Sequence, residues 1–297
     1  MAKTFNGPDI IYELGNEPNL TQFWNPTNAA AYGAAMAGGV VAIKTVQPTA
    51  TVISAGIADY GDSTLWGGFI QQMIAAAGSS FSRIDGVGMH TYLGGDLSGA
   101  RQPPEWWYLY PTLYPDLKKY SAPAKNFYLT EGGFPIERSG NNATRQAILN
   151  SRAMLTAILM QVKCYIHYDL INDNTGNASE DSYGLYLHDA STKKPSAVAF
   201  GNLMQVINSC TSYSIQAPTT YSGDASYAIR FATSTTPQSI AWTSLASSTV
   251  NLGKPQAVAV IKASDLFGGP VSVSYDGSGN LIIPVSDAVG PVLVSGA

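Results

Sequence analysis

Charged side chains are scarce in this chain of 297 residues. Asp, Glu, Lys and Arg together make up 12% of it, which is about half the share found in average soluble proteins. The formal net charge is −4, and no segment concentrates lysine and arginine. Without a basic patch, neither nucleic acid nor an anionic membrane surface is an expected partner.

Cysteine and long apolar runs are also missing. The two cysteines, Cys164 and Cys210, allow at most one intrachain disulfide, so the chain is not a disulfide scaffold. A bridge and a pair of free thiols both fit the sequence. No apolar run reaches the ~20 residues that a membrane-spanning helix needs.

The N-terminal residues and the composition bear on the location of the protein. Residues 1–3 begin no apolar stretch of the kind that a secretory signal peptide has. The chain is instead rich in Gly, Ser, Thr, Ala and Tyr, a mixture common in secreted or cell-surface proteins that act on carbohydrates. We expect a secreted or periplasmic protein whose leader has been removed, with a cytoplasmic location as the alternative.

Strand-like and helix-like segments alternate up to about residue 209. The expected strands cover residues 10–14, 50–55, 84–92, 127–130 and 164–171, and the expected helices cover residues 26–46, 65–77, 113–120, 144–162 and 197–208. This alternation is typical of parallel βα units. Hydrophobic residues make up 45% of the chain, so a sizeable core is expected.

The rest of the chain is predicted to be all β. Short strands are expected at residues 227–231, 239–243, 257–261, 271–275, 281–285 and 292–294, with turn residues between them and no helix. We therefore predict two domains, an α/β domain over residues 1–209 and a small β-sandwich over residues 210–297.

Two glutamates stand at the ends of predicted strands. Glu17 follows the apolar residues 10–14 and lies in the sequence Asn16-Glu17-Pro18-Asn19. Proline cannot continue a strand ladder and asparagine favours turns, so the strand ends there. Glu131 follows a second such run and precedes Gly132-Gly133. Because catalytic groups of α/β barrels gather at the carboxyl ends of strands, both glutamates are candidate catalytic residues.

A pair of carboxyl groups suits the hydrolysis of a glycosidic bond. In a retaining glycosidase one carboxyl group gives a proton to the leaving oxygen, while a second, ionised group attacks the anomeric carbon. The two groups lie ~5–5.5 Å apart, and their surroundings favour opposite protonation states. We therefore expect Glu17 and Glu131 to act as a pair.

Three motifs resemble clan A of the retaining glycoside hydrolases, whose TIM barrels carry one glutamate after strand four and another after strand seven. Asn16-Glu17-Pro18 is similar to the clan's Asn-Glu-Pro motif, Thr130-Glu131-Gly132 to its strand-seven motif, and His90-Thr91-Tyr92 to its strand-six pattern. The resemblance implies that Glu17 is the acid/base and Glu131 the nucleophile. It also implies that Asn16 binds the sugar 2-hydroxyl, that Tyr92 contacts the nucleophile and that His90 lines the site.

The resemblance is nearest to families 39, 5 and 30, whose barrels carry a β-sandwich. In this clan a tryptophan on strand eight often forms the floor of the sugar site. His167 stands at the matching position here, either as a site residue or as a histidine satisfied in the core. Strands one to three have no counterpart, so the resemblance implies an incomplete TIM-type barrel made of strands four to eight, five βα units in all. A natural truncation and a fragment of a longer protein both fit.

Such an arc would have two open sheet edges, whereas a closed barrel pairs every strand on both sides. Open edges invite pairing with another chain. We therefore expect a homo-oligomer that covers the edges, with an arc closed on itself as the alternative.

Other candidate residues have a structural alternative each. Trp24, Trp106 and Trp107 are candidates for stacking on sugar rings, with packing of their own loops as the alternative. Glu13 has the strand parity of Glu17, and we expect it to be an interior carboxylate paired with a basic group.

Neither a metal nor a cofactor is expected. Asp169 and Asp173 are acidic neighbours, but they lack the spacing of a calcium loop. No glycine-rich phosphate loop follows a predicted strand.

The expected function is that of a retaining glycoside hydrolase, which cleaves β-linked glycans such as cellulose or xylan, or their oligosaccharides, by double displacement. The alternative is a catalytically inactive, carbohydrate-binding remnant of such an enzyme, which would lack the sugar contacts that strands one to three supply.

Overall fold

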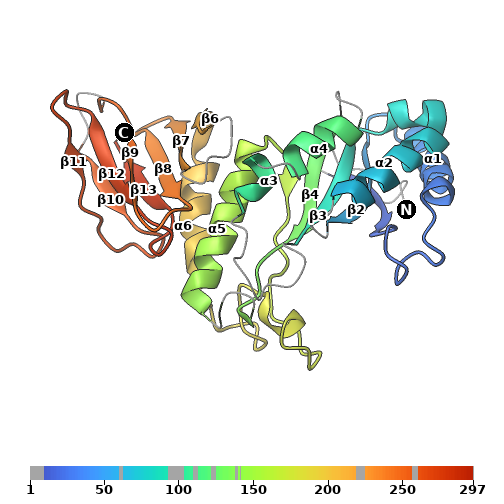
Figure 1. Cartoon of the computed structure of the whole chain (residues 1–297), viewed down its shortest axis with the longest axis horizontal. Helices are drawn as coiled ribbons and strands as arrows, with labels where there is room; N and C mark the ends of the chain where they lie inside the picture. Colours follow the sequence, from blue (N-terminus) through green and yellow to red (C-terminus); the bar gives the residue numbers. More distant parts are fainter. Residues whose placement is uncertain are drawn as a thin grey trace. The chain divides into compact units, whose positions relative to one another are not determined.

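The computed structural model describes residues 10–59, 63–92, 104–109, 113–121, 125–137, 140, 142–218, 225–255 and 260–296. The chain divides into two compact units, whose elements are labelled in Figure 1. The parallel-sheet unit comprises Met1–Arg101, Tyr110–Gly133 and Met160–His167, and the antiparallel-sheet unit comprises Gln102–Leu109, Phe134–Leu159 and Tyr168–Ala297.

One five-stranded sheet, in the order β1-β2-β3-β4-β5, forms the parallel-sheet unit. Its strands are β1 (Ile11–Asn16), β2 (Thr51–Asp59), β3 (Gly86–Thr91), β4 (Asn126–Gly132) and β5 (Cys164–Tyr165). All neighbouring pairs are parallel, as the sequence predicts. β5 is shorter than the predicted strand at 164–171. Cys164 and Cys210 are both free thiols.

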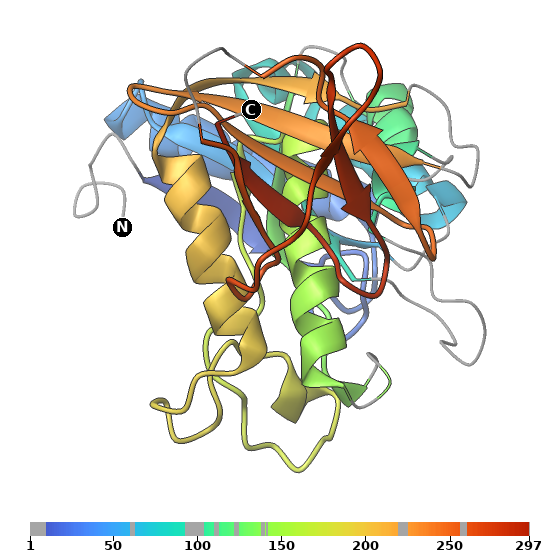
Figure 2. The same cartoon turned by 90° about the vertical axis from the view of Figure 1, so that its left-hand side faces the viewer.

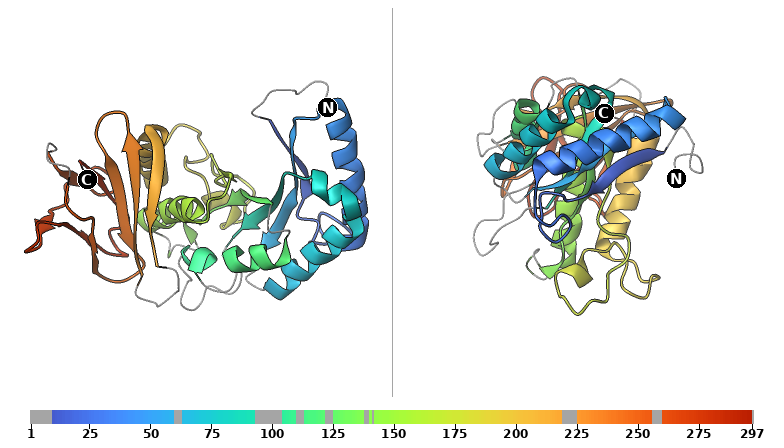
Figure 3. Two further views of the ribbon diagram at one scale, coloured as in Figure 1. Left: turned by 90° about the horizontal axis from the view of Figure 1, so that it is seen from above. Right: turned by 90° about the vertical axis from the view of Figure 1, so that its right-hand side faces the viewer.

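Helices α1 (Ala29–Val46), α2 (Ser63–Ala77) and α4 (Leu113–Tyr120), with the 3-10 helix η1 (Gly78–Arg83), belong to the same unit. α1 and α2 lie side by side against the sheet (Figure 3). Asn28 caps α1, because its side chain accepts a hydrogen bond of 2.9 Å from the backbone N–H of Ala31.

α1 is also the one helix of the described residues whose length and hydropathy would allow a membrane span. A packed helix of a globular protein passes the same test. A Cβ on Gly33 of α1 would lie 2.4 Å from the carbonyl oxygen of Met73 in α2. The two helices are therefore closely packed, and α1 serves as a layer of the fold.

The antiparallel-sheet unit contains α3 (Trp106–Leu109), α5 (Ala143–Leu159), η3 (Glu180–Ser182), α6 (Pro195–Asn208) and two antiparallel sheets. One sheet has the order β10-β13-β8-β7-β6 and the other β11-β12-β9. The strands are β6 (Cys210–Gln216), β7 (Ser226–Thr233), β8 (Gln238–Thr243), β9 (Ser248–Asn251), β10 (Lys262–Ser264), β11 (Ser274–Tyr275), β12 (Leu281–Val285) and β13 (Val292–Ser295).

The two sheets share a hydrophobic cluster, which consists of Ala228, Ala241, Val250, Leu252, Leu281, Ile283, Val285, Val292 and Val294. Sequence reasoning found most of these strands but missed β6 and β9, and of the strand predicted at 257–261 only residues 260–261 are described. β6 is exposed at most of its positions. It therefore lacks the apolar alternation by which the other strands are recognised.

The predicted boundary at residue 209 is not where the compact units divide. Helices α5 and α6 lie side by side (Figure 2) and belong with the antiparallel sheets. Buried Arg152 of α5 pairs with Glu105 and Asp287, and Trp242 donates to Glu105 over 2.8 Å. These pairs join α5 to the segments that carry Glu105 and Asp287.

Two adjacent glycines of α2 provide a test of the packing. A Cβ on Gly67 would lie 2.4 Å from the ring of Tyr120, whereas a Cβ on Gly68 would meet nothing within 4 Å. We expect Gly67→Ala to destabilise the protein by about 1–3 kcal/mol, because it overpacks the contact between α2 and α4. Gly68→Ala should stabilise it by about 0.5–1 kcal/mol through helix propensity. Chemical denaturation of both variants measures the difference, and equal effects would contradict the predicted packing.

Candidate active site

The turn after β1 holds Glu17 in a fixed and strained position. Gly15 has a φ of 114° and Glu17 a φ of 40°, and a non-glycine residue in this region costs of order 1–3 kcal/mol. The backbone N–H of Glu17 donates to the carbonyl of Gly56 over 3.0 Å. Asn19 fastens the turn to β2, because its side chain accepts from the N–H of Ala58 and donates to its carbonyl.

The ends of β3 and β4 supply the other members of the site. His90 pairs in register with Glu131, next to an irregularity between Met89 and His90. The imidazole is 1% exposed. Its Nδ1 lies 2.9 Å from Oε1 of Glu17 and 3.6 Å from Oε2 of Glu131. Tyr92 donates from its hydroxyl to Oε1 of Glu131 over 2.5 Å. The structure thus brings Glu17, His90, Tyr92 and Glu131 together. One hydrogen bond joins His90 to Glu17, another joins Tyr92 to Glu131, and an ion-pair distance of 3.6 Å separates His90 from Glu131.

A third carboxylate, Glu13, lies on the other side of the imidazole. Its Oε1 is 3.9 Å from Nε2 of His90 and accepts a hydrogen bond of 2.8 Å from the hydroxyl of Thr130. Sequence reasoning expected a basic partner for Glu13 without naming one. The partner in the structure is His90.

Gly56 makes room for the imidazole. A Cβ at this position would lie 1.9 Å from Nε2 of His90, so any side chain on Gly56 would displace the ring. Sequence reasoning missed this residue. A glycine in the middle of an otherwise apolar strand was the available signal, since it often marks a close approach.

The carboxylates change how the site holds protons. Burial alone would lower the pKa of His90, but the hydrogen bond to Glu17 and the charges of Glu131, Glu17 and Glu13 outweigh it and raise that pKa. Burial raises the pKa of Glu13, and the hydrogen bond from Thr130 opposes the rise. The cluster therefore favours a proton on the imidazole, and burial opposes ionisation of Glu13.

Three other predicted site residues, Asn16, Trp24 and His167, belong to the parallel-sheet unit. Asn16 ends β1 and is exposed. Trp24 is half-buried, and its ring meets that of Tyr32 edge-on at 5.7 Å. His167 is half-buried in the parallel-sheet unit. Sugar binding by these three residues stays a prediction.

Trp106 and Trp107 belong to the antiparallel-sheet unit. Trp107 is 1% exposed and stacks on Phe134 with ring centroids 6.3 Å apart. A ring so enclosed cannot present a face to a sugar. The alternative prediction, that the ring anchors its own segment, therefore fits Trp107. Trp106 is half-buried, and its stacking on a sugar ring stays a prediction.

Another group of titratable residues lies in the antiparallel-sheet unit, within residues 169–194. Burial lowers the pKa of Lys194 to about 8, and burial together with the charge of Asp173 raises the pKa of Asp169 to about 6. The ammonium group donates to the carbonyl of Ser182 over 2.8 Å and to Asn172 over 3.1 Å. These contacts hold the loops together, which explains the burial of a lysine.

Glu17, His90 and Glu131 could also offer one ligand atom each to a metal ion, since these atoms lie within 4.8 Å of one another. The sequence predicts no metal, and this stays a prediction. Among the described contacts, the same atoms are engaged in hydrogen bonds and ion pairs within the cluster.

The fold is shared with glycoside hydrolases of clan A. A family 39 glycoside hydrolase from the gut symbiont Bacteroides cellulosilyticus WH2 is 22% identical with a TM-score of 0.69, over 96% of this chain and 57% of that one. A family 51 α-L-arabinofuranosidase, AbfB, from Bifidobacterium longum is 10% identical with a TM-score of 0.63, over 95% and 66% of the two chains. A family 44 xyloglucanase from Paenibacillus polymyxa, solved with xyloglucan, is 12% identical with a TM-score of 0.59, over 100% and 69%.

These likenesses confirm the predicted resemblance at the level of fold. By sequence, the chain matches no family model and no curated protein. It spans 57% of the length of the family 39 hydrolase and 66% of that of the arabinofuranosidase.

The proton balance of the site can be tested through His90. We expect its pKa to lie above the ordinary histidine value and to fall in Glu17→Gln, because a neutral amide replaces the bonded carboxylate. NMR titration of the imidazole protons measures this. The chain has three histidines, and His167→Asn and His188→Asn assign the other two resonances. A His90 pKa that does not respond to Glu17→Gln would contradict the contact.

The same shift makes stability depend on pH. A raised pKa means that the protonated imidazole stabilises the folded state. This contribution is complete below the pKa of histidine in the unfolded chain and is lost as the pH rises through the higher folded value.

Proposed function

We propose that this protein is a retaining glycoside hydrolase in which Glu17 and Glu131 carry the reaction. The supporting observation is the position of the two carboxyl groups, whose nearest ligand atoms lie within 4.8 Å of each other across the buried His90. Retention of configuration uses two carboxyl groups ~5–5.5 Å apart, whereas inversion needs ~6.5–9.5 Å to admit a water molecule. The geometry therefore favours the double-displacement route.

The contacts suit each glutamate to a different role. Glu131 attacks the anomeric carbon with one carboxylate oxygen, while the hydroxyl of Tyr92 holds its Oε1. Glu17 is the more enclosed of the two, with a side chain 11% exposed against 30% for Glu131. It protonates the leaving oxygen and then takes a proton from the water that releases the sugar. His90 shares its hydrogen bond with Glu17 and so orients that carboxyl group.

The proposed substrates are β-linked glycans of the cellulose or xylan type, or their oligosaccharides. Support comes from the fold shared with a xyloglucanase and a family 39 hydrolase. Fold alone does not determine substrate, so the linkage follows from the resemblance of the motifs. A secreted or periplasmic location is proposed with it, because such polymers are extracellular.

A catalytically inactive, carbohydrate-binding remnant is the second candidate. It is favoured by one observation, that the chain spans 57% of the length of the family 39 hydrolase. Much of a glycan-binding cleft can therefore be contributed by segments with no counterpart here. Turnover of an activated aryl glycoside separates the two candidates, since it needs the carboxyl groups and few remote contacts.

We also propose that a second copy of the chain covers an edge of the parallel sheet. Among the described strands, β1 pairs only with β2 and β5 only with β4. Ile11, on the edge strand β1, is 40% exposed. Unpaired strand edges favour association.

Substitution of the two glutamates tests the hydrolase. We expect Glu131→Ala to abolish turnover of aryl β-glycosides, and Glu17→Ala to reduce turnover of poorly activated substrates by about 10²–10⁴-fold, as removal of a general acid does. Azide should rescue Glu17→Ala and give a β-glycosyl azide. The control is Glu137→Ala, at an exposed glutamate in the other unit. Unchanged turnover in the Glu17 and Glu131 variants would overturn the proposal.

Sedimentation tests the assembly. At micromolar concentration the protein should sediment as a dimer or larger species, and Ile11→Lys should shift it toward the monomer because an edge lysine opposes strand pairing. Val198→Lys is the matched control, since Val198 is 41% exposed on α6 of the other unit. A well-folded monomer would refute the assembly and leave the hydrolase proposal intact.

A further inference from the structure

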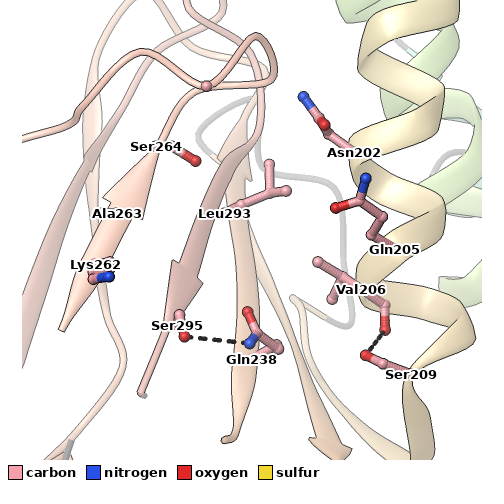
Figure 4. Close-up of a pocket in the computed structure, with 11 residues that line it drawn as sticks. Asn202, Gln205, Val206, Ser209, Gln238, Lys262, Ala263, Ser264, Leu293 and Ser295 are labelled. Atoms are coloured by element: carbon pink, nitrogen blue, oxygen red, sulfur yellow. Dashed lines mark hydrogen bonds between the residues drawn. The ribbon is translucent and has the colours of Figure 1, made fainter. Parts of the chain in front are cut away.

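A cavity of about 520 Å³ lies between α6 and the five-stranded sheet of the antiparallel-sheet unit (Figure 4). Its volume falls within the roughly 300–1,000 Å³ of sites for small molecules. All of its lining residues belong to this one unit, and Glu17, His90 and Glu131 belong to the other. It is therefore a feature separate from the candidate active site.

The helix side of the cavity is mainly polar, with Val206 as its apolar residue. Asn202 and Gln205 of α6 and the C-cap residue Ser209 follow one another at spacings of three and four residues, which places them on one face as a polar stripe. Asn202 and Gln205 extend toward the sheet in Figure 4. Helix-to-sheet packing is normally apolar, and the neighbouring stripe of α6 with Ala199 and Leu203 is fully buried. The cavity lies beside the polar stripe, whereas the apolar stripe is packed without a gap.

The sheet side combines one more amide with an apolar patch. Gln238 of β8 donates from Nε2 to the hydroxyl of Ser295 over 3.2 Å, which fixes the orientation of its amide group. Leu293 of β13 extends from the sheet toward α6 (Figure 4). The cavity therefore presents carboxamides around an aliphatic surface.

The carboxamides keep hydrogen-bonding capacity for a ligand. Asn202 donates from Nδ2 to the carbonyl of Leu266 over 2.8 Å, so its Oδ1 is left to accept. Gln205 is exposed, and its side chain makes no hydrogen bond with the part of the chain that the structure describes. Each carboxamide offers a donor and an acceptor side by side, which matches two adjacent hydroxyl groups on a sugar ring.

Charge narrows the class of ligand further. Among the described lining residues, Lys262 is the single charged side chain and there is no carboxylate. The lining therefore does not suit a metal ion, which prefers carboxylate oxygens. Nor does it have the clustered arginines of a phosphate site. A neutral ligand with many hydroxyl groups and an aliphatic C–H face fits the donors, the acceptors and Leu293 together.

We propose that this cavity is a second carbohydrate-binding site, which holds a neutral oligosaccharide segment away from the bond that is cleaved. This inference builds on the proposed function, because the ligand belongs to the class of the proposed substrate. A second site of this kind raises the local concentration of a polymeric glycan at the enzyme by linking two binding events.

Calorimetric titration with cellohexaose and xylohexaose tests the site. The background is Glu131→Gln, so that the ligand is not cleaved. We expect Gln205→Ala to weaken one binding event by roughly 5- to 10-fold, the loss of about one neutral hydrogen bond, and Asn202→Ala to weaken the same event. Gln216→Ala is the matched control, because Gln216 is an exposed glutamine on β6 that does not line the cavity.

The outcomes distinguish this site from the catalytic proposal. If binding is independent of Gln205 and Asn202 in a protein that hydrolyses glycosides, the proposed second binding site is refuted and the hydrolase proposal stands. Binding that depends on Gln205, in a protein without turnover, would support the cavity and overturn the hydrolase. With Glu131 intact, Gln205→Ala should leave turnover of a short aryl glycoside unchanged and lower turnover of the polymer. A loss of turnover on the short substrate would place Gln205 in the active site and contradict the proposal.

Discussion

The hydrogen bond between His90 and Glu17 is the contact on which the rest of the site depends. Three carboxylates, Glu13, Glu17 and Glu131, surround one buried imidazole at distances of 3.9, 2.9 and 3.6 Å. Like charges this close repel one another more strongly in a buried site than in water. A cation between them offsets the repulsion and links the ends of β1, β3 and β4. The ring can occupy this position only because residue 56 is a glycine and has no side chain.

The sequence was sufficient to predict the parallel sheet and the two glutamates, because both leave local signals. Apolar segments that alternate between strand and helix periodicity define βα units without any knowledge of contacts. Glu17 stands where a strand must end, since Pro18 cannot continue the ladder. Glu131 precedes Gly132, the last residue of β4. The carboxyl ends of parallel strands meet at one edge, and this turns two distant sequence positions into neighbours.

What the sequence could not reveal depends on partners that are distant along the chain. Whether Trp107 stacks on a sugar or on Phe134 cannot be read from its neighbours in sequence, and the structure shows Phe134. The division between the units also depends on contacts that are distant in sequence. Arg152 is an unremarkable helix residue in the sequence, yet its buried pairs with Glu105 and Asp287 join α5 to both ends of the antiparallel-sheet unit.

The groups proposed for the chemistry and those that would bind the rest of the glycan are separable in this chain. Glu17, His90, Tyr92 and Glu131 all come from the ends of β1, β3 and β4, with Gly56 of β2 beside them. A short activated substrate needs little beyond these groups. A polymer, in contrast, reaches its full rate only when remote contacts contribute binding energy to the transition state. In the proposed hydrolase, weaker remote contacts should therefore slow the turnover of long substrates and leave that of short activated substrates unchanged.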